Sequence, residues 1–261
     1  MLHAGGAGDR PRAGQRLRIA LTYRTPVILL SDGYLANGAE PWAVPDVDDL
    51  PDLRSAVAFA TEPNGEDGEF LPYLRDEETL ARPWAIPGTA GMQHRVGGLE
   101  KADRTGNISY DPANHDFMTR TRQAKIDGIA ASLPPTEVDD PDGDAKVAVI
   151  GWGSTYGPIG AACRRIRRSG RSIAQIHLRH INPMPSDLGE ILRRYDQVVC
   201  PEMNLGQLSM LLRAKYLVDV ESHTQVRGLP FRSAELAAVI QDVIDSTSGA
   251  PLAADSSGGA E

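Results

Sequence analysis

The sequence predicts an α/β protein whose second half contains a mostly parallel sheet. Three observations lead to this prediction. Between residues 146 and 245, short apolar runs alternate with amphipathic helical patterns, which is the order of a parallel sheet with right-handed crossovers. The run from Val27 to Leu30 is apolar throughout, as in a strand that is covered on both faces. The intervening segment, 43–135, follows neither pattern and is rich in proline and glycine.

The composition excludes several classes of function. The 261 residues are 41% hydrophobic and 24% charged, with a net charge of −8, which suits one or two globular domains. The negative charge argues against a nucleic-acid or membrane-surface role. No apolar run approaches about 18 residues, so no transmembrane helix is expected. The N-terminus lacks the apolar core of a secretory signal, and we therefore expect a cytoplasmic chain.

The two cysteines point to no metal centre. Cys163 and Cys200 form no CxxC pair and cannot hold an iron–sulfur cluster or a structural zinc by themselves. We expect both to be small buried apolar side chains in a reducing compartment.

The N-terminal region is expected to be incomplete as a domain. Residues 1–15 mix Gly, Ala, Arg and Pro and are predicted to be disordered. A short helix is predicted for 16–23, followed by the strand at 27–30. A single parallel strand leaves its backbone groups unpaired. Residues 1–45 are therefore interpreted as the end of a larger α/β domain whose front part is absent or supplied by another chain.

The following segment is expected to be an irregular connector. Short extended pieces at 69–74 and 84–86 are separated by turn signals. A helix is predicted for 116–129. Its basic residues, Arg120, Arg122 and Lys125, are expected to lie on a solvated face. A linker rich in proline and acidic residues, 132–145, ends the connector.

After the linker, strands and helices alternate. Ser186 and Ser233 are expected to cap helices, and Pro158 suits the first turn of another. From Ser246 on, small residues dominate and the tail is expected to be mobile. The predicted strands are 147–151, 172–181 and 197–201, with one or two further short strands from 217–220 and 225–227. The predicted helices are 157–168, 186–194, 206–215 and one that begins at Ser233.

The loop after the first of these strands, from Gly151 to Gly157, has the spacing GxGxxxG. Backbone N–H groups at such a turn can bind a phosphate or another anion, which makes Gly153, Ser154 and Thr155 candidate ligand contacts. A dinucleotide site would also need an acidic residue at the end of the next strand. That strand ends without one, which argues against a dinucleotide site. The alternatives for this loop are an anion site, a purely structural turn and, least favoured, dinucleotide binding.

A second candidate loop runs from Glu202 to Gln207, at the carboxyl end of a strand, where open α/β sheets bind ligands. Asn204 and Gln207 offer amide groups, and Gly206 allows a ligand to approach the backbone closely. The alternative is that the carboxylate and the amides cap the next helix.

The histidines and serines indicate no further catalytic centre. His177 and His180 lie three apart on one predicted strand and so point to opposite faces, which argues against a shared metal. A structural role is expected for each histidine, and no GxSxG elbow is present.

Five segments, in order, carry a resemblance to a known family. They read LLSDGYLANGAEPW, GGLEKADRTGNISYDPANHDFMTRTRQAKI, VIGWGSTYG, HLRHINPMP and CPEMNLGQL. Together they resemble the α subunit of the 2-oxoacid:ferredoxin oxidoreductases, most closely the actinobacterial 2-oxoglutarate:ferredoxin oxidoreductase type. The resemblance extends from about Arg16 to Asp245.

The resemblance implies a thiamine diphosphate pyrimidine-binding domain followed by a transketolase C-terminal-like α/β domain. It implies a β subunit that brings the diphosphate half of the cofactor site and an iron–sulfur cluster. The implied reaction is oxidative decarboxylation of a 2-oxoacid, with transfer of the acyl group to coenzyme A and of electrons to ferredoxin. Thiamine diphosphate, Mg²⁺ and the cluster would belong to the complex, and none is expected on this chain alone.

The sequence also departs from the family. Two segments of the family, one like YPITP and one like RGGPSTGLPT, have no matching positions in this sequence. The same is true of the family's glutamate that activates the aminopyrimidine ring of thiamine diphosphate. We therefore expect the C-terminal part of an α subunit, inactive as an isolated chain, with no catalytic residue assigned. The expected ranges are a disordered start (1–15), a remnant of the pyrimidine-binding domain (16–45), the connector (46–145), the transketolase C-terminal-like domain (146–245) and a disordered tail (246–261).

Two alternatives stay open. One is a non-catalytic interaction module that binds a β-type subunit or an anion through the two loops. The other is a small nucleotide-binding α/β protein.

Overall fold

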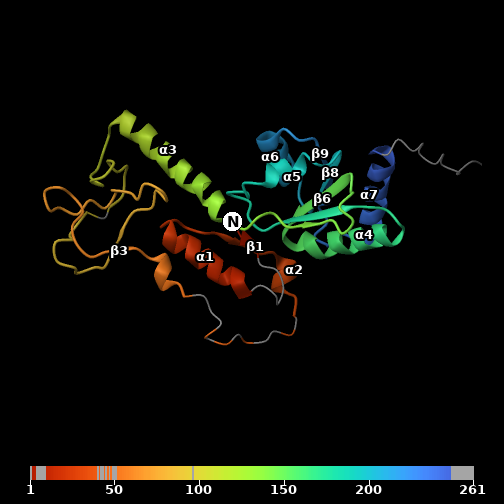
Figure 1. Cartoon of the computed structure of the whole chain (residues 1–261), viewed down its shortest axis with the longest axis horizontal. Coiled ribbons are helices and arrows are strands. Elements are labelled where there is room, and N and C mark those ends of the chain that lie inside the picture. The colour runs from red at the N-terminus through yellow and green to blue at the C-terminus, as the bar shows by residue number, and fades with distance from the viewer. Residues whose placement is uncertain are drawn as a thin grey trace, which may run out of the picture. The chain divides into compact units, whose positions relative to one another are not determined.

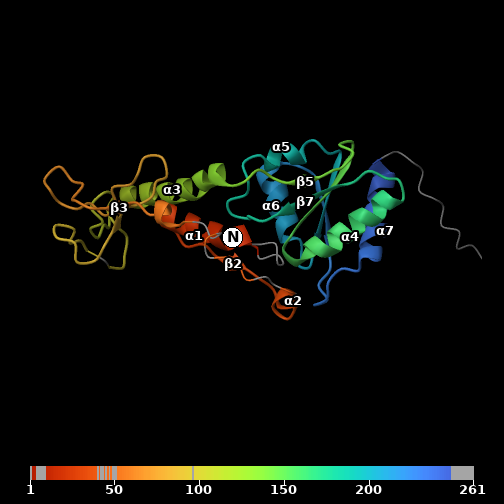
Figure 2. The ribbon, with the colours of Figure 1, turned by 60° about the horizontal axis from the view of Figure 1, so that its bottom comes forward.

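The structure is a computed structural model that describes residues 2–3, 10–39, 41, 44, 46, 48, 52–95 and 97–247. The chain divides into two compact units, coloured along the chain in Figures 1 and 2. One unit comprises Met1–Leu30, Ala39–Leu133 and His180–Pro183, and the other comprises Ser31–Gly38, Pro134–Arg179 and Met184–Glu261.

The second unit is built on a five-stranded sheet. Its strands are β5 (Val138–Asp139), β6 (Val147–Trp152), β7 (Ala174–Leu178), β8 (Gln197–Glu202) and β9 (Val220–Thr224). They lie in the order β5-β7-β6-β8-β9. All neighbours run parallel except β5, which is antiparallel to β7. The predicted mostly parallel α/β sheet is therefore confirmed.

Helices cover this sheet on both faces. α4 (Tyr156–Arg168) and α7 (Ser233–Thr247) lie side by side in both views (Figures 1 and 2). They pack with β6 and β8 in one apolar core that includes Ile159, Ile166 and Ile240. α6 (Gln207–Tyr216) contacts β8 and β9. It also contacts α5 (Leu188–Leu192), where a Cβ added at Gly189 would lie 2.6 Å from the Tyr216 ring.

Two predictions for this unit need correction. One or two strands were predicted for 217–220 and 225–227, and a single strand, β9 (Val220–Thr224), forms instead at a shifted position. It begins later because Leu217 adopts a left-handed conformation (φ 54°) that ends α6. Ser186 does not cap the next helix. Asp187 is the residue before α5, and its carboxylate accepts hydrogen bonds from Thr136 N (2.9 Å) and Thr136 Oγ1 (2.7 Å).

The first unit contains two longer helices and two short parallel pairs of strands. α1 (Arg10–Thr22) and α3 (Pro112–Ile129) pack through Ile19, Tyr23 and Ile129. α3 begins four residues earlier than predicted because Asp111 caps it and Pro112 occupies its first turn. The strand pairs are β1 (Leu2–His3) with β2 (Leu29–Leu30), and β3 (Phe59–Ala60) with β4 (Trp84–Ala85).

These elements correct the expectations for the N-terminal region. The strand near Val27 has a neighbour, because β2 pairs with β1. The prediction that residues 1–15 are disordered is wrong for Leu2–His3 and for the part that belongs to α1. Residues 1 and 4–9 lie outside the described residues.

The remaining helices are short. α2 is a single turn (Gly33–Ala36), and the described residues include the 3₁₀ turns η2 (Arg54–Ala56), η3 (Ala130–Ser132) and η4 (Gly153–Thr155). Residues 246–247 belong to α7, and the rest of the predicted mobile tail lies outside the described residues. Among the helices that the structure describes, none combines the length and apolarity needed to cross a bilayer.

Candidate functional site

The two candidate ligand loops leave neighbouring strands at one edge of the sheet. β6 and β8 pair in parallel, so the loops after them begin at the same carboxyl edge. β7 lies on the other side of β6. This arrangement is a topological switch point, where open α/β sheets bind ligands. The structure thus brings together two loops that the sequence singled out separately.

The loop after β6 forms the tight turn η4. Gly153 has a φ of 68°, which favours glycine. Thr155 is buried, and its hydroxyl donates to the Trp152 carbonyl at 2.7 Å, while Ser154 is half-buried. α4 then begins at Tyr156 with no side chain capping its N-terminus among the described residues. Among the described residues, no carboxylate bonds to the backbone N–H groups of this turn, and an anion site here stays a prediction.

The loop after β8 is closed by a buried carboxylate. The Glu202 side chain is 0% exposed. One of its oxygens accepts from Leu208 N at 2.8 Å and from Asn204 Nδ2 at 3.0 Å, and the other accepts from Ser209 N at 3.0 Å. The protein therefore places its own negative charge at the N-terminus of α6, where the helix dipole favours an anion.

The Asn204 side chain forms hydrogen bonds within the same loop. Its Oδ1 accepts from Gly206 N at 2.8 Å and from Gln207 N at 3.0 Å. Gly206 has a φ of 88°, which again favours glycine. Helix capping accounts for all these contacts, and ligand binding by Asn204, Gly206 and Gln207 stays a prediction.

The described histidines make local contacts. The His177 ring lies edge-on to Tyr156, with ring centroids 4.8 Å apart. His94 Nδ1 lies 2.8 Å from the Met92 carbonyl, and its ring contacts Phe70. Among the described residues, no group of three or more His, Cys, Asp and Glu side chains could hold a metal ion.

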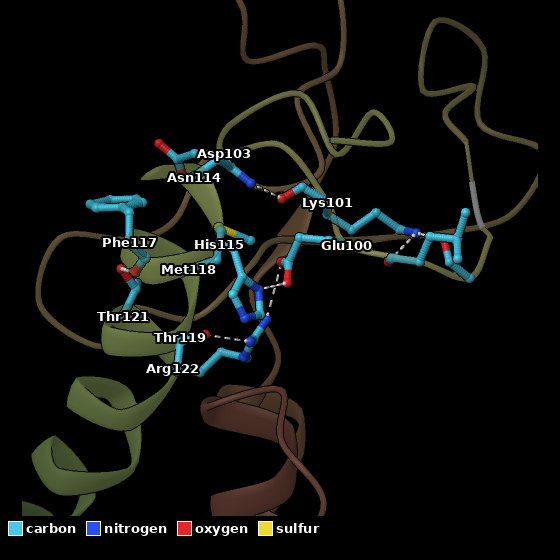
Figure 3. A network of polar contacts seen from close by, with 12 residues as sticks. Glu100, Lys101, Asp103, Asn114, His115, Phe117, Met118, Thr119, Thr121 and Arg122 are labelled. Atoms are coloured by element: carbon cyan, nitrogen blue, oxygen red, sulfur yellow. Dashed lines mark hydrogen bonds and ion pairs between the residues drawn. The ribbon is translucent and has the colours of Figure 1, made fainter. Parts of the chain in front are cut away.

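A polar network joins the segment around residues 100–103 to α3 (Figure 3). Glu100 accepts a hydrogen bond from His115 Nδ1 at 2.6 Å and pairs with Arg122 at 3.4 Å. The hydrogen bond from His115, with a smaller contribution from Arg122, holds the pKa of Glu100 below its usual range. All three groups reach solvent, so the contribution of these pairs to stability is small.

Asn114, on α3, forms a second link to the same segment. Its Nδ2 donates to the Lys101 carbonyl at 2.8 Å, and its Oδ1 accepts from Asp103 N at 3.0 Å (Figure 3). Asp103 in turn forms an ion pair with Arg75 at 2.6 Å. The network thus positions a carboxylate that orients an arginine of the connector.

That arginine belongs to a cluster of cations and aromatic rings which the sequence did not predict. We call it the basic cluster, and its members are Arg24, Arg75, Arg82, Lys125, Tyr73 and Trp84. The Arg82 guanidinium lies 4.4 Å from the centroid of the Tyr73 ring, and the Arg24 guanidinium lies 4.7 Å from that of Trp84. Arg75 also faces Tyr73, at 5.7 Å. Such cation–π contacts fix the orientation of the guanidinium planes.

Lys125 corrects the prediction of a solvated basic face on α3. Arg120 and Arg122 are exposed and paired with Asp116 and Glu100. Lys125 is half-buried instead. Burial, together with the charges of Arg82, Arg75 and Arg24, lowers its pKa to about 8.

This lowered pKa leads to a prediction about stability. The folded state binds fewer protons at Lys125 than the unfolded state between the folded pKa of about 8 and the ordinary value of 10.5. The contribution of Lys125 to the free energy of unfolding therefore rises with pH between about 8 and 10.5. This contribution is least favourable below pH 8. Replacing Lys125 by Met is expected to raise stability most at pH 7 and least near pH 10.

Urea unfolding of both proteins in chloride buffers at pH 7, 8, 9 and 10 measures this difference. Lys215→Met is a matched control, because Lys215 is exposed on α6 and its removal should shift all the midpoints alike. A stability difference between Lys125→Met and the unchanged chain that does not vary with pH would contradict the assignment.

Several known proteins are similar to this chain. The family model described as "Pyruvate flavodoxin/ferredoxin oxidoreductase, thiamine diP-bdg" matches residues 12–111. The "2-oxoglutarate oxidoreductase subunit KorA" of Mycobacterium tuberculosis is 58% identical over 227 residues, which are 87% of this chain and 34% of that protein. The "2-oxoacid:ferredoxin oxidoreductase 2, subunit alpha" of Aeropyrum pernix is 31% identical over 85% of this chain and 34% of that protein.

A solved structure agrees with these relatives. The 2-oxoglutarate:ferredoxin oxidoreductase from Magnetococcus marinus, determined with 2-oxoglutarate, coenzyme A and succinyl-CoA bound, aligns with a TM-score of 0.75 and 29% identity. The alignment covers 93% of this chain and 42% of that chain. The chain spans about a third of the length of the two curated relatives described above.

Proposed function

We propose that this chain contributes to a 2-oxoacid:ferredoxin oxidoreductase that acts on 2-oxoglutarate. The chain is a relative of the α subunits of these enzymes, which confirms the resemblance seen in the sequence. The observation that carries the proposal is the 58% identity to a 2-oxoglutarate oxidoreductase subunit over 87% of the chain. The reaction would be oxidative decarboxylation of the 2-oxoacid to an acyl-CoA, with ferredoxin as the electron acceptor. The relatives give no support to a stand-alone interaction module.

The described cysteines of this chain do not fit the iron–sulfur cluster of such an enzyme. An iron–sulfur cluster needs several thiolates. Cys163 and Cys200 lie on α4 and β8 and are both buried. Burial raises the pKa of Cys163 to about 12 and raises that of Cys200 as well, which disfavours thiolates at both positions.

The thiamine diphosphate family model matches residues 12–111. Among the described residues, no group of three or more His, Cys, Asp and Glu side chains could hold a metal ion. The buried carboxylate of Glu202 is already bonded to three N–H groups. We infer that a β-type partner subunit brings the iron–sulfur cluster and the diphosphate half of the thiamine diphosphate site. We also propose that the complex is cytoplasmic.

We also propose domain assignments. The remnant of the pyrimidine-binding domain would be 16–45, the connector 46–145 and the transketolase C-terminal-like domain 146–245. The parallel sheet formed by β6 to β9 supports the third of these ranges. The thiamine diphosphate family model matches residues 12–111, which overlap both of the first two ranges and do not separate them.

Co-expression with a candidate β-type subunit tests the proposed function. We expect the chain, expressed alone, to contain no iron and to show no 2-oxoglutarate- and coenzyme-A-dependent reduction of ferredoxin or a dye. A complex that it forms with the partner should contain thiamine diphosphate and iron if the partner supplies those sites. Turnover by the chain alone, or its failure to co-purify with any cofactor-containing partner, would overturn the proposal.

A further inference from the structure

The basic cluster combines several positive charges with little compensation. Three arginines and a lysine contribute four positive charges, and Asp103, paired with Arg75, contributes one negative charge. Within the described part of the chain, no ion pair joins a carboxylate to Arg24, Arg82 or Lys125. All four cations are half-buried. Like charges repel more strongly where water screens them less, so this arrangement favours binding of an anion.

The cations are held in place by the surrounding structure. An Arg24 guanidinium N–H donates to the Pro83 carbonyl, and the Trp84 indole N–H donates to the Leu21 carbonyl at 2.9 Å. Arg75 is fixed by Asp103 and by a contact with the Met118 sulfur at 3.1 Å. The cluster is therefore organised before any ligand arrives, which reduces the entropy cost of binding.

Backbone strain gathers at the same place. Arg24, Leu80 and Arg104 have left-handed φ values of 44°, 53° and 62°. Side chains other than glycine rarely adopt this region, and such strain is found preferentially at binding sites. One of these residues belongs to the basic cluster, and the other two are close in sequence to its members or to Asp103.

Arg82 and Lys125 have N–H donors that could bind a ligand. Among the described residues, the Arg82 guanidinium has no hydrogen-bond acceptor, and Lys125 Nζ reaches only the Arg24 carbonyl, at 3.5 Å. A guanidinium plane and an ammonium group match the several oxygens of a phosphate group. A phosphate dianion also balances the excess charge better than a monocarboxylate does.

We propose that the basic cluster is a binding site for a phosphate group, either free or carried by a small phosphate ester, with Arg82 and Lys125 as its direct ligands. This inference does not depend on the proposed enzyme activity.

Protection of Lys125 from acetylation tests the site in the full chain. At pH 8, inorganic phosphate should protect Lys125 saturably, as measured by mass spectrometry, while the exposed Lys146 and Lys215 remain reactive. Potassium chloride at equal ionic strength should not protect it. Equal protection of all lysines, or none at Lys125, would overturn the proposal.

Variants sharpen the test. Arg82→Gln should raise the phosphate concentration for half protection by about tenfold, the loss expected for one charge-assisted hydrogen bond. Arg165→Gln, which removes an exposed arginine of α4, should leave it unchanged. An unchanged value in a folded Arg82→Gln protein, checked by circular dichroism, would contradict the assignment. If that variant does not fold, the comparison of phosphate with chloride in the unchanged chain decides.

Succinate and glycerol phosphate, each at equal ionic strength, distinguish the ligand classes. Protection by glycerol phosphate at lower concentration than by succinate supports a phosphate site. Tighter protection by succinate would overturn it.

Discussion

Replacing Glu202 by Ala is expected to lower the free energy of unfolding by about 3 kcal/mol. The carboxylate is fully buried and accepts from two backbone N–H groups of α6 and from the amide of Asn204. Alanine leaves all three donors without their acceptor in a site that is shielded from water. Removing a buried charge recovers part of this loss, which is why the expected effect is smaller than the sum of three hydrogen bonds.

Urea unfolding followed by circular dichroism measures the effect. Glu202→Gln is expected to cost less than alanine, because the amide oxygen still accepts, although its NH₂ group then faces a backbone donor. Glu221→Ala is the matched control, since Glu221 is exposed on the neighbouring strand β9, and its change should stay within about 0.5 kcal/mol. Equal effects of Glu202→Ala and Glu221→Ala would refute the capping role.

The second half of the fold was predictable because its periodicity is strong. The strands β6 and β8 and the helices α4, α6 and α7 begin within about two residues of their predicted starts, because each has one continuous apolar run or stripe. β9 was misplaced because the apolar residues Leu217 and Val218 suggested a strand. A left-handed turn at Leu217 places that residue in solvent instead.

The N-terminal region was less predictable because its partner is distant in sequence. The strand β2 pairs with Leu2 and His3, in a stretch whose composition alone suggested disorder. Local pattern carries no information about such a pairing.

The basic cluster escaped prediction for a similar reason. Lys125 and Arg24, which meet in the folded chain, are 101 residues apart, so no spacing rule links them. A usable signal was present in the alternation of aromatic and basic residues in Tyr73-Leu74-Arg75 and Arg82-Pro83-Trp84. The capping role of Glu202 could be predicted as an alternative, because a carboxylate just before a helix can accept hydrogen bonds from the free backbone N–H groups of its first turn.

Replacing Gly151 by Ala is expected to cost about 2 kcal/mol of stability, an effect of overpacking. A Cβ at this position would lie 2.3 Å from Ile159 Cδ1 and 2.8 Å from Thr155 Oγ1. Ile159 is 1% exposed and belongs to the core between β6, α4 and α7, so its side chain has little room to move. The cause is space and not the backbone conformation, because Gly151 lies outside the left-handed region.

A double-mutant cycle separates this cause from others. Ile159→Val removes the clashing Cδ1 atom and by itself should cost about 1 kcal/mol. If the clash is the cause, the double variant should lose less stability than the sum of the two single variants, by about 1 kcal/mol or more. Gly157→Ala, in the first turn of α4, is the control, since a Cβ there meets nothing within 4 Å. It should leave stability unchanged or slightly raised. Additive losses in the cycle would show that the close approach of Gly151 to Ile159 does not determine the packing of this turn.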